Sequence, residues 1–410
     1  MPILYPRGQI VGWCAEAFLV GIVLATITLS VSVNIPFIMG LLVVSLLLIP
    51  WVVDARIRIT LLCIACGCFG CLRVVTVDVP FLSLASPMKA MTIASAKRKL
   101  IAKELSAEPL VAVQNNFTTR IKEALPSEEA SLLSGMLYGE TYFSKETQTT
   151  FRRAGILHVV AVSGANISIL VVLVARFCVR LGANRRQAWV ALSVSIILFV
   201  LFVSPSASVT RAAIMGLLSE LGPLCGRVPR PTRLLLIAAC LFTFWQPGAL
   251  LLDAGFALSF LAMSGLILYG PLIERLIPDR IPALLREAVV STMAATLFTT
   301  PYLLWAFHQM SLFGLLTNLI IVPLVPWTML FGAIALFLPI HSSIFLPAKG
   351  CLSFILWVAH LTDGVTMGVW TKISFSWQSC VACYVVLLSL WGFIEQRNRV
   401  MHRIAQRKIK

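Results

Sequence analysis

The sequence predicts an all-α polytopic integral membrane protein. Hydrophobic residues make up 59% of the 410 residues and charged residues only 12%, and the mean hydropathy is +0.92. An ordinary soluble domain has about a quarter of its residues charged. Apolar runs of the length that a helix needs to cross a bilayer recur along the chain. We expect about 9–12 transmembrane or re-entrant helices, with an insert of amphipathic and short helices.

Residues 1–77 are predicted to form the N-terminal transmembrane helices, near 10–32, 35–53 and 57–77. No small-residue cleavage site follows a short apolar core, so we interpret the first helix as retained rather than as a signal peptide. The run CIACGCFGC at 63–71 has a spacing that invites a metal site. It lies in an apolar helix with no loop to surround an ion. We therefore interpret its cysteines as small side chains at a helix–helix contact.

Residues 78–155 are predicted to form a polar insert with amphipathic and short helices. Apolar side chains at helical spacing indicate an amphipathic helix that suits a membrane surface; they are Val113, Phe117, Ile121 and Leu125. Ser127 and Ser144 are typical N-cap residues with acids in the following turn. They predict the starts of two further short helices.

Residues 156–395 are predicted to form the main transmembrane channel domain. The candidate helices are 156–181, 187–203, 207–224, 233–246, 248–270, 283–307, 311–338, 350–369 and 378–395. Gly and Pro interrupt the block at GPLCGRVPRP. Such half-length segments occur at membrane depth only where they line protein or a water-filled cavity, which favours a channel or transporter. The basic segment 396–410 is predicted to be a cytoplasmic tail by the positive-inside rule.

The net charge of +16 has two explanations. Basic loops on the cytoplasmic side give many membrane proteins such a surplus. Alternatively, the charge serves a path for a polyanion such as nucleic acid or anionic lipid. Between residues 150 and 272 Lys is absent, and the acids are Glu220 and Asp253. Arginine is the better phosphate ligand because its guanidinium donates two parallel hydrogen bonds.

Four polar residues within apolar runs are candidates for this path. Asp253 is either the N-cap of a long apolar helix or a functional carboxylate. Arg211 is its natural partner or a phosphate contact, on a helix that begins with Ser206 or Ser208. His308 follows an apolar run and is expected at the membrane interface. Asn318 precedes two prolines and is expected to satisfy the carbonyls that they free.

The stretch GILHVVAVSGANISIL at 155–170 combines His158, Ser163, Gly164 and Asn166. On one helix Ser163 and Asn166 share a face, and Gly164 loosens that helix. The context AVSGAN is not the G-x-S-x-G of a nucleophile elbow. No acid partner completes a catalytic triad. We therefore expect no catalytic residue here, but a polar stripe that faces inward.

These motifs resemble those of the ComEC/Rec2 family of competence proteins. The resemblance rests on four stretches in the family's order over about 120–340. They are LLSGMLYGETYFSKETQTTFRRAG, GILHVVAVSGANISIL, SVTRAAIMGLLSELGPLCGR followed by DAGFALSFLAMSGLILYGP, and PYLLWAFHQMSLFGLLTNLIIVPLVP. The family's OB-like domain is not expected in the insert, which is too short for a five-stranded barrel. A metallo-β-lactamase-like domain is not expected because no H-x-H-x-D-H pattern occurs.

The resemblance implies an inner-membrane channel that moves single-stranded DNA into the bacterial cytoplasm during natural transformation. We expect no enzyme activity, no metal and no cofactor, since neither a nuclease signature nor a G-x-x-x-x-G-K-[ST] motif is present. A separate DNA receptor, a nuclease and a cytoplasmic translocase are the implied partners, besides DNA and the bilayer. The candidate DNA-path residues are His158, Ser163, Gly164, Asn166, Ser208, Arg211, Asp253, Ser259, His308 and Asn318.

An alternative function stays open at this point: a small-molecule or ion-coupled membrane transporter of unknown cargo. Asp253 distinguishes the two, because a proton-coupled carrier needs a titrating carboxylate at membrane depth. A passive DNA conduit needs Asp253 only as a cap. The sequence does not give the oligomeric state.

Overall fold

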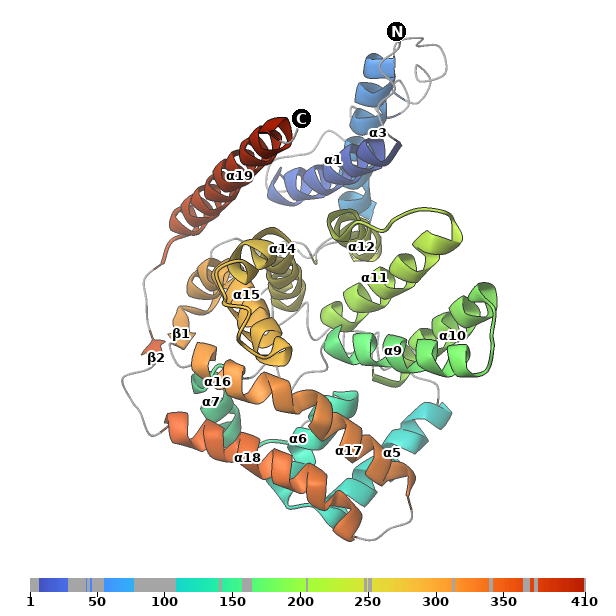
Figure 1. Cartoon of the computed structure of the whole chain (residues 1–410), viewed down its shortest axis with the longest axis vertical. Helices are drawn as coiled ribbons and strands as arrows, with labels where there is room; N and C mark the ends of the chain where they lie inside the picture. The colour runs from blue at the N-terminus through green and yellow to red at the C-terminus, as the bar shows by residue number, and fades with distance from the viewer. Residues whose placement is uncertain are drawn as a thin grey trace. The chain divides into compact units, whose positions relative to one another are not determined.

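A computed structural model describes most of the chain as helices (Figure 1). The described residues are 7–28, 42, 45, 55–76, 108–139, 142–156, 164–203, 206–246, 249, 253–311, 314–338, 342–363, 369–371 and 375–408. Close contacts divide the chain into two compact units. The first comprises Met1–Asn116 and Val162–Phe260, and the second comprises Phe117–Ala161 and Leu261–Lys410. Along the chain, helices α5 (Glu108–Ala124) and α14 (Ala254–Glu274) pass from one unit into the other.

The first unit contains the helices that carry most of the predicted site. They are α1 (Arg7–Thr28), α3 (Ala55–Thr76), α9 (Gly164–Arg180), α10 (Arg185–Val203), α11 (Ala207–Leu224) and α12 (Pro231–Trp245). In this unit α9, α10 and α11 pack on one another, and α12 packs on both α1 and α11. Aromatic rings fill the contact between α12 and the start of α14, where the ring centroids of Phe256 and Phe260 are 4.2 Å apart.

The second unit contains the short helices of the insert and the C-terminal helices. Its elements are α6 (Ser127–Tyr138), α7 (Lys145–Arg153), α15 (Ala283–Phe307), β1 (Gln309–Ser311), α16 (Gly314–Ile321), the 3₁₀ turn η1 (Val322–Leu324), α17 (Val325–Phe337), η2 (Ser342–Phe345), α18 (Leu346–Asp363), β2 (Val369–Thr371) and α19 (Trp377–Lys408). Tyrosine hydroxyls connect its long helices. Tyr269 donates to the carbonyl of Leu387, and Tyr384 donates to that of Phe298, both at 2.7 Å.

The fold class predicted from the sequence is confirmed. In the described part of the chain, five helical segments are long and apolar enough to cross a membrane: Arg185–Val203, Ala254–Glu274, Leu285–Phe307, Gly314–Phe337 and Trp377–Asn398. Four shorter apolar helices are Gly12–Ile22, Thr60–Gly70, Pro231–Trp245 and Leu346–Thr362. The sequence did not predict the small antiparallel ribbon in which Met310 of β1 pairs with Trp370 of β2.

Several helix boundaries agree closely with the prediction, and α11 ends at Leu224 as expected. The helix predicted over 311–338 is present as the helical segment Gly314–Phe337, in which the 3₁₀ turn η1 interrupts the regular α-helix between α16 and α17. Pro323 and Pro326 explain this break in the α-helix because proline has no N–H to donate to the preceding turn. The helix predicted over 35–53 lies outside the described residues except for 42 and 45. The predicted domain boundaries at 77, 155 and 395 stay a prediction.

Helices α1 and α3 pack with their backbones in contact. A Cβ atom on Gly21 of α1 would collide with the carbonyl oxygen of Gly67, which lies within the cysteine-rich run of α3. Small residues at this position therefore permit the approach, as they do where membrane helices associate. Among the described residues no three His, Cys, Asp or Glu side chains are grouped to hold a metal. The backbone contact between Gly21 and Gly67 supports the interpretation of CIACGCFGC as part of a helix–helix contact.

The amphipathic helix of the insert is present as α5, and Phe117, Ile121 and Leu125 of its predicted apolar face are partly or fully buried. Val113 is 42% exposed, and the polar residues Gln114 and Thr118 are buried in addition. Thr118 has a hydroxyl partner, because its Oγ1 lies 2.8 Å from the Tyr138 hydroxyl. Apolar spacing alone does not reveal such polar residues, because hydrogen bonding rather than hydrophobicity permits their burial.

We predict that Gly21→Ala lowers the thermal stability of the protein, although alanine is the better helix former. The added methyl group has to displace the backbone of α3, and overpacking of this kind costs about 1–3 kcal/mol. Gly12→Ala is the matched control on the same helix, because nothing lies within 4 Å of a Cβ atom there. The unfolding temperature in detergent measures both; equal stability of the two variants would contradict the packing.

Candidate functional site

The centre of the candidate site is Arg211, in the second turn of α11. The helix begins after Ser206, whose side chain accepts a hydrogen bond from the N–H of Val209 at 3.3 Å. Ser206 is therefore the N-cap, and the alternative start at Ser208 is not used. One helical turn beyond the cap, this start places Arg211 on the buried side of α11, where the side chain is 7% exposed.

The guanidinium of Arg211 is held by neutral groups. Its Nε donates to Ser259 Oγ on α14 at 2.7 Å, and its Cζ lies 5.9 Å from the ring centroid of Phe260. Its Nη1 is 4.0 Å from the sulfur of Met215. None of the acidic residues that the structure describes forms an ion pair with it. A buried cation is costly unless an anion compensates it, and the described contacts of Arg211 are all to neutral groups.

Gly164 allows the start of α9 to lie against this arginine. A Cβ atom at Gly164 would be 3.1 Å from the Cβ of Ala212 and 3.4 Å from Nη2 of Arg211. The carbonyl oxygen of Ser208 would be 4.0 Å away. Asn166, in the same first turn of α9, is 5% exposed. The structure therefore brings Gly164, Ser208 and Arg211 together, as a site shared by α9 and α11.

Asp253 acts as the N-cap of α14. Its Oδ1 accepts hydrogen bonds from the N–H groups of Gly255 at 2.8 Å and Phe256 at 3.2 Å. The side chain is 4% exposed. The structure shows no ion pair between Asp253 and Arg211: Oδ1 of Asp253 caps its own helix, and Nε of Arg211 bonds to Ser259. Of the two roles open to Asp253, the structure supports the cap.

His158 and Ser163 lie outside the described residues. The helix predicted over 156–181 is described only from Gly164 onward, as α9. The helical face that Ser163 and Asn166 were expected to share therefore stays a prediction.

His308 and Asn318 belong to the second unit. His308 ends α15 with a left-handed backbone (φ 54°) and is exposed, as an interfacial residue would be. Asn318 is 9% exposed, and its Oδ1 is buried without a hydrogen-bond partner among the described residues. The carbonyl of Leu324, within the proline break, is bonded by Thr328 at 2.9 Å. Thr328 therefore donates a hydrogen bond to one of the carbonyls in this segment, the role that we predicted for Asn318.

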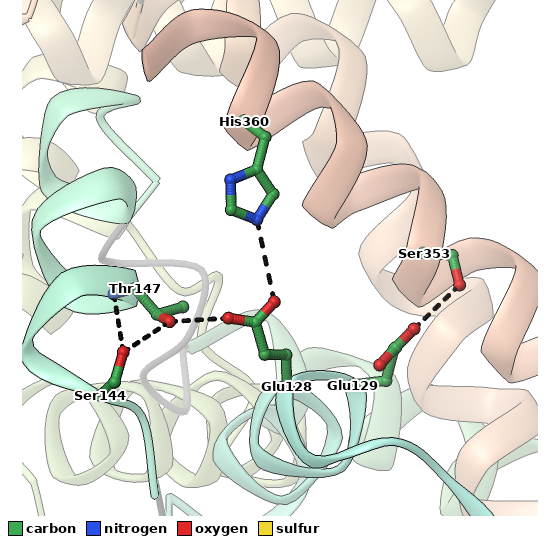
Figure 2. A network of polar contacts seen from close by, with 6 residues as sticks. All are labelled: Glu128, Glu129, Ser144, Thr147, Ser353 and His360. Atoms are coloured by element: carbon green, nitrogen blue, oxygen red, sulfur yellow. Dashed lines mark hydrogen bonds and ion pairs between the residues drawn. The ribbon is translucent and has the colours of Figure 1, made fainter. Parts of the chain in front are cut away.

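A second polar centre was not predicted from the sequence (Figure 2). Glu128 on α6 accepts a hydrogen bond from Thr147 of α7 at 2.8 Å and faces His360 of α18 at 3.8 Å. Ser144, the predicted N-cap of α7, accepts from the N–H of Thr147 at 3.1 Å. Ser353 of α18 donates to Glu129 at 3.2 Å. These contacts connect α6 to both α7 and α18. The sequence did not predict them because the paired residues are far apart along the chain.

The fold and the site together define a polytopic helical membrane protein that buries an arginine between helices without an acidic partner among the described residues. The family model described as "Competence protein" matches residues 136–397. Because this covers more than half of the chain, the chain belongs to the Competence protein family.

One relative is "ComE operon protein 3" of Bacillus subtilis (strain 168). It is 25% identical over 227 residues, which is 55% of this chain and 28% of that protein. The match therefore spans little more than a quarter of the relative's length. No solved structure matches the chain.

We predict that Asp253→Asn leaves the stability of the protein almost unchanged, because asparagine is as good an N-cap as aspartate. Asp253→Leu removes the acceptor for two N–H groups and is expected to cost about 0.5–2 kcal/mol. Thermal unfolding of the three proteins in one detergent measures the difference. A stability loss in the asparagine variant as large as that in the leucine variant would show that the negative charge, not the cap, matters.

We also predict that Glu128→Ala destabilises the protein by about 1 kcal/mol, since it replaces the charged acceptor of the buried Thr147 hydroxyl by the neutral Ser144 Oγ, which lies 2.9 Å away. Glu128→Gln keeps an acceptor oxygen and loses only the exposed pair with His360, which contributes at most about 1 kcal/mol. Unfolding temperatures compare the two variants. If the glutamine variant is as unstable as the alanine variant, the pair with His360, which both variants lose, is the dominant contact.

Proposed function

We propose that the chain forms a membrane conduit that passes single-stranded DNA into the cytoplasm during natural transformation. Membership of the Competence protein family supports a role in DNA uptake. The observation that carries the more specific proposal is the buried cation of Arg211, whose described neighbours include no compensating carboxylate. A DNA strand supplies one phosphate after another as the missing counter-charge, and arginine binds phosphate with good geometry.

The surroundings of Arg211 suit a ligand that passes through rather than stays. Ser259 and the ring of Phe260 orient the guanidinium without neutralising it. The start of α9 at Gly164 lies beside the guanidinium, and on this proposal a passing strand displaces it to reach Arg211. On this proposal the contact opens during translocation and closes when no DNA is present.

The remaining roles in uptake are assigned to partners on this proposal. A receptor delivers the DNA, a nuclease degrades one strand, and a cytoplasmic translocase supplies the force. We place the protein in the bacterial inner membrane with the basic end of α19 in the cytoplasm, because basic segments stay on that side. The alternative of an ion-coupled carrier loses its main support, since Asp253 has a structural role as a helix cap.

Deletion of the gene is expected to abolish transformation while DNA still binds at the cell surface. The role of Arg211 is then tested by complementing the deletion strain with variants of the gene and measuring the transformation frequency. In the complemented strain we predict that Arg211→Met lowers transformation about tenfold or more, because a charge-assisted hydrogen bond contributes about 1.5–3 kcal/mol. Arg227→Met, which removes an exposed arginine beyond the end of α11, is the matched control and is expected to transform normally.

Arg211→Lys distinguishes the contribution of the positive charge from that of the hydrogen bond to Ser259. It is expected to give an intermediate transformation frequency, because lysine keeps the cation but not the Nε–H donor. Immunoblots of the membrane fraction confirm that all variants accumulate equally. Normal transformation by Arg211→Met at an unchanged protein level contradicts the proposed role.

A further inference from the structure

A groove of about 450 Å³ lies along the C-terminal half of α9 in the first unit. Its lining consists of Leu173, Val174, Arg176, Phe177 and Arg180. Three of these side chains are apolar and two carry guanidinium groups. The groove therefore offers an aliphatic or aromatic wall together with two cations, and the site at Arg211 uses none of these residues.

The turn between α9 and α10 places two more arginines beyond the end of the helix that forms the groove. Gly182 has a left-handed backbone (φ 68°), and the N–H of Ala183 bonds back to the carbonyl of Cys178 at 3.0 Å. This closes α9 in the usual way for a glycine-terminated helix. Asn184 and Gln187 then cap α10 reciprocally at 2.9 Å. Arg185 and Arg186 form the first turn of α10.

The positive charge at this end is not compensated within the described part of the protein. The segment 164–203 contains no Asp or Glu. No described acid pairs with any of its four exposed arginines, which are Arg176, Arg180, Arg185 and Arg186. The first turn of a helix favours acids, because the helix dipole is positive there. α10 carries two cations at that place instead, so an external anion stabilises this end.

We infer the position of the groove relative to the membrane from α10, whose length and apolar composition make it one of the candidate spans. Arginines at the end of a span lie at the level of the lipid headgroups. Large apolar side chains close to the groove are also exposed: Phe177 is 62% exposed and Val179 76%. The same short segment therefore meets both the headgroup layer and the acyl chains.

We propose that this groove binds an anionic phospholipid. The headgroup phosphate contacts Arg176 and Arg180, and an acyl chain lies against Leu173, Val174 and Phe177. A nucleic acid matches the cations equally well, but it has no aliphatic chain to cover the apolar wall. Basic pockets of this type at the ends of membrane helices bind lipid headgroups. The inference is independent of the proposed DNA conduit, because it uses a different face of α9.

The test measures lipid retention by the purified full-length protein. Native mass spectrometry is applied after exchange into detergent with equal amounts of phosphatidylglycerol and phosphatidylcholine. The wild type is expected to retain phosphatidylglycerol preferentially, and Arg176→Gln/Arg180→Gln to lose that preference by about tenfold or more. Arg227→Gln/Arg230→Gln removes two exposed arginines elsewhere in the same unit and is expected to retain it.

Two competition arms identify the ligand. Glycerol phosphate supplies the phosphate without the acyl chains and is expected to leave phosphatidylglycerol bound. A 20-nucleotide single strand is expected to leave it bound as well. Displacement by glycerol phosphate would show a free-phosphate site, and displacement by the oligonucleotide would show a nucleic-acid surface; either result overturns the proposal.

If Arg176→Gln/Arg180→Gln does not fold, Arg176→Lys/Arg180→Lys is measured in its place. This variant retains both cations and is expected to keep the preference for phosphatidylglycerol, with a smaller ratio. Equal retention of both lipids by the wild type also overturns the proposal, because the groove then holds only ordinary annular lipid.

Discussion

The buried cation of Arg211 is the constraint on which the candidate site depends. Arg211 is 7% exposed, and a buried cation is costly unless a carboxylate or another anion compensates its charge. The described acidic residues do not supply the carboxylate, and Asp253 is engaged by the N–H groups of α14. Neutral partners hold the side chain in place, so its charge stays available.

Helix ends and breaks provide the geometry around this cation. The cap at Ser206 sets where α11 begins and therefore which side of the helix carries Arg211. The cap at Asp253 likewise sets the start of α14, two turns before Ser259. Gly164 lets α9 begin in contact with α11. In membranes such helix ends persist only where protein groups or water satisfy the backbone, and at the starts of α11 and α14 the side chains of Ser206 and Asp253 do so.

Hydropathy and capping residues predicted most of the fold, because both act locally. The ends of α10 and α11 and the caps at Ser144 and Asp253 follow from residues within one turn. The burial of Arg211 and its bond to Ser259 depend on helices that are distant in the sequence. The same is true of the contact between Glu128 and His360. Spacing along one helix does not contain this information, so the sequence alone left two roles open for Arg211, a pair with Asp253 or a phosphate contact.

The most direct test of the account is to capture DNA beside Arg211 during uptake. A photo-crosslinking amino acid is placed at Met215, whose sulfur lies 4.0 Å from Arg211 Nη1, and at the exposed Val194 of α10 as control. Uptake is stalled with a strand that carries a bulky end, and the cells are irradiated. The account predicts crosslinks to DNA at position 215 and none at 194. Efficient transformation with no crosslink at 215, or with equal crosslinks at both positions, would contradict it.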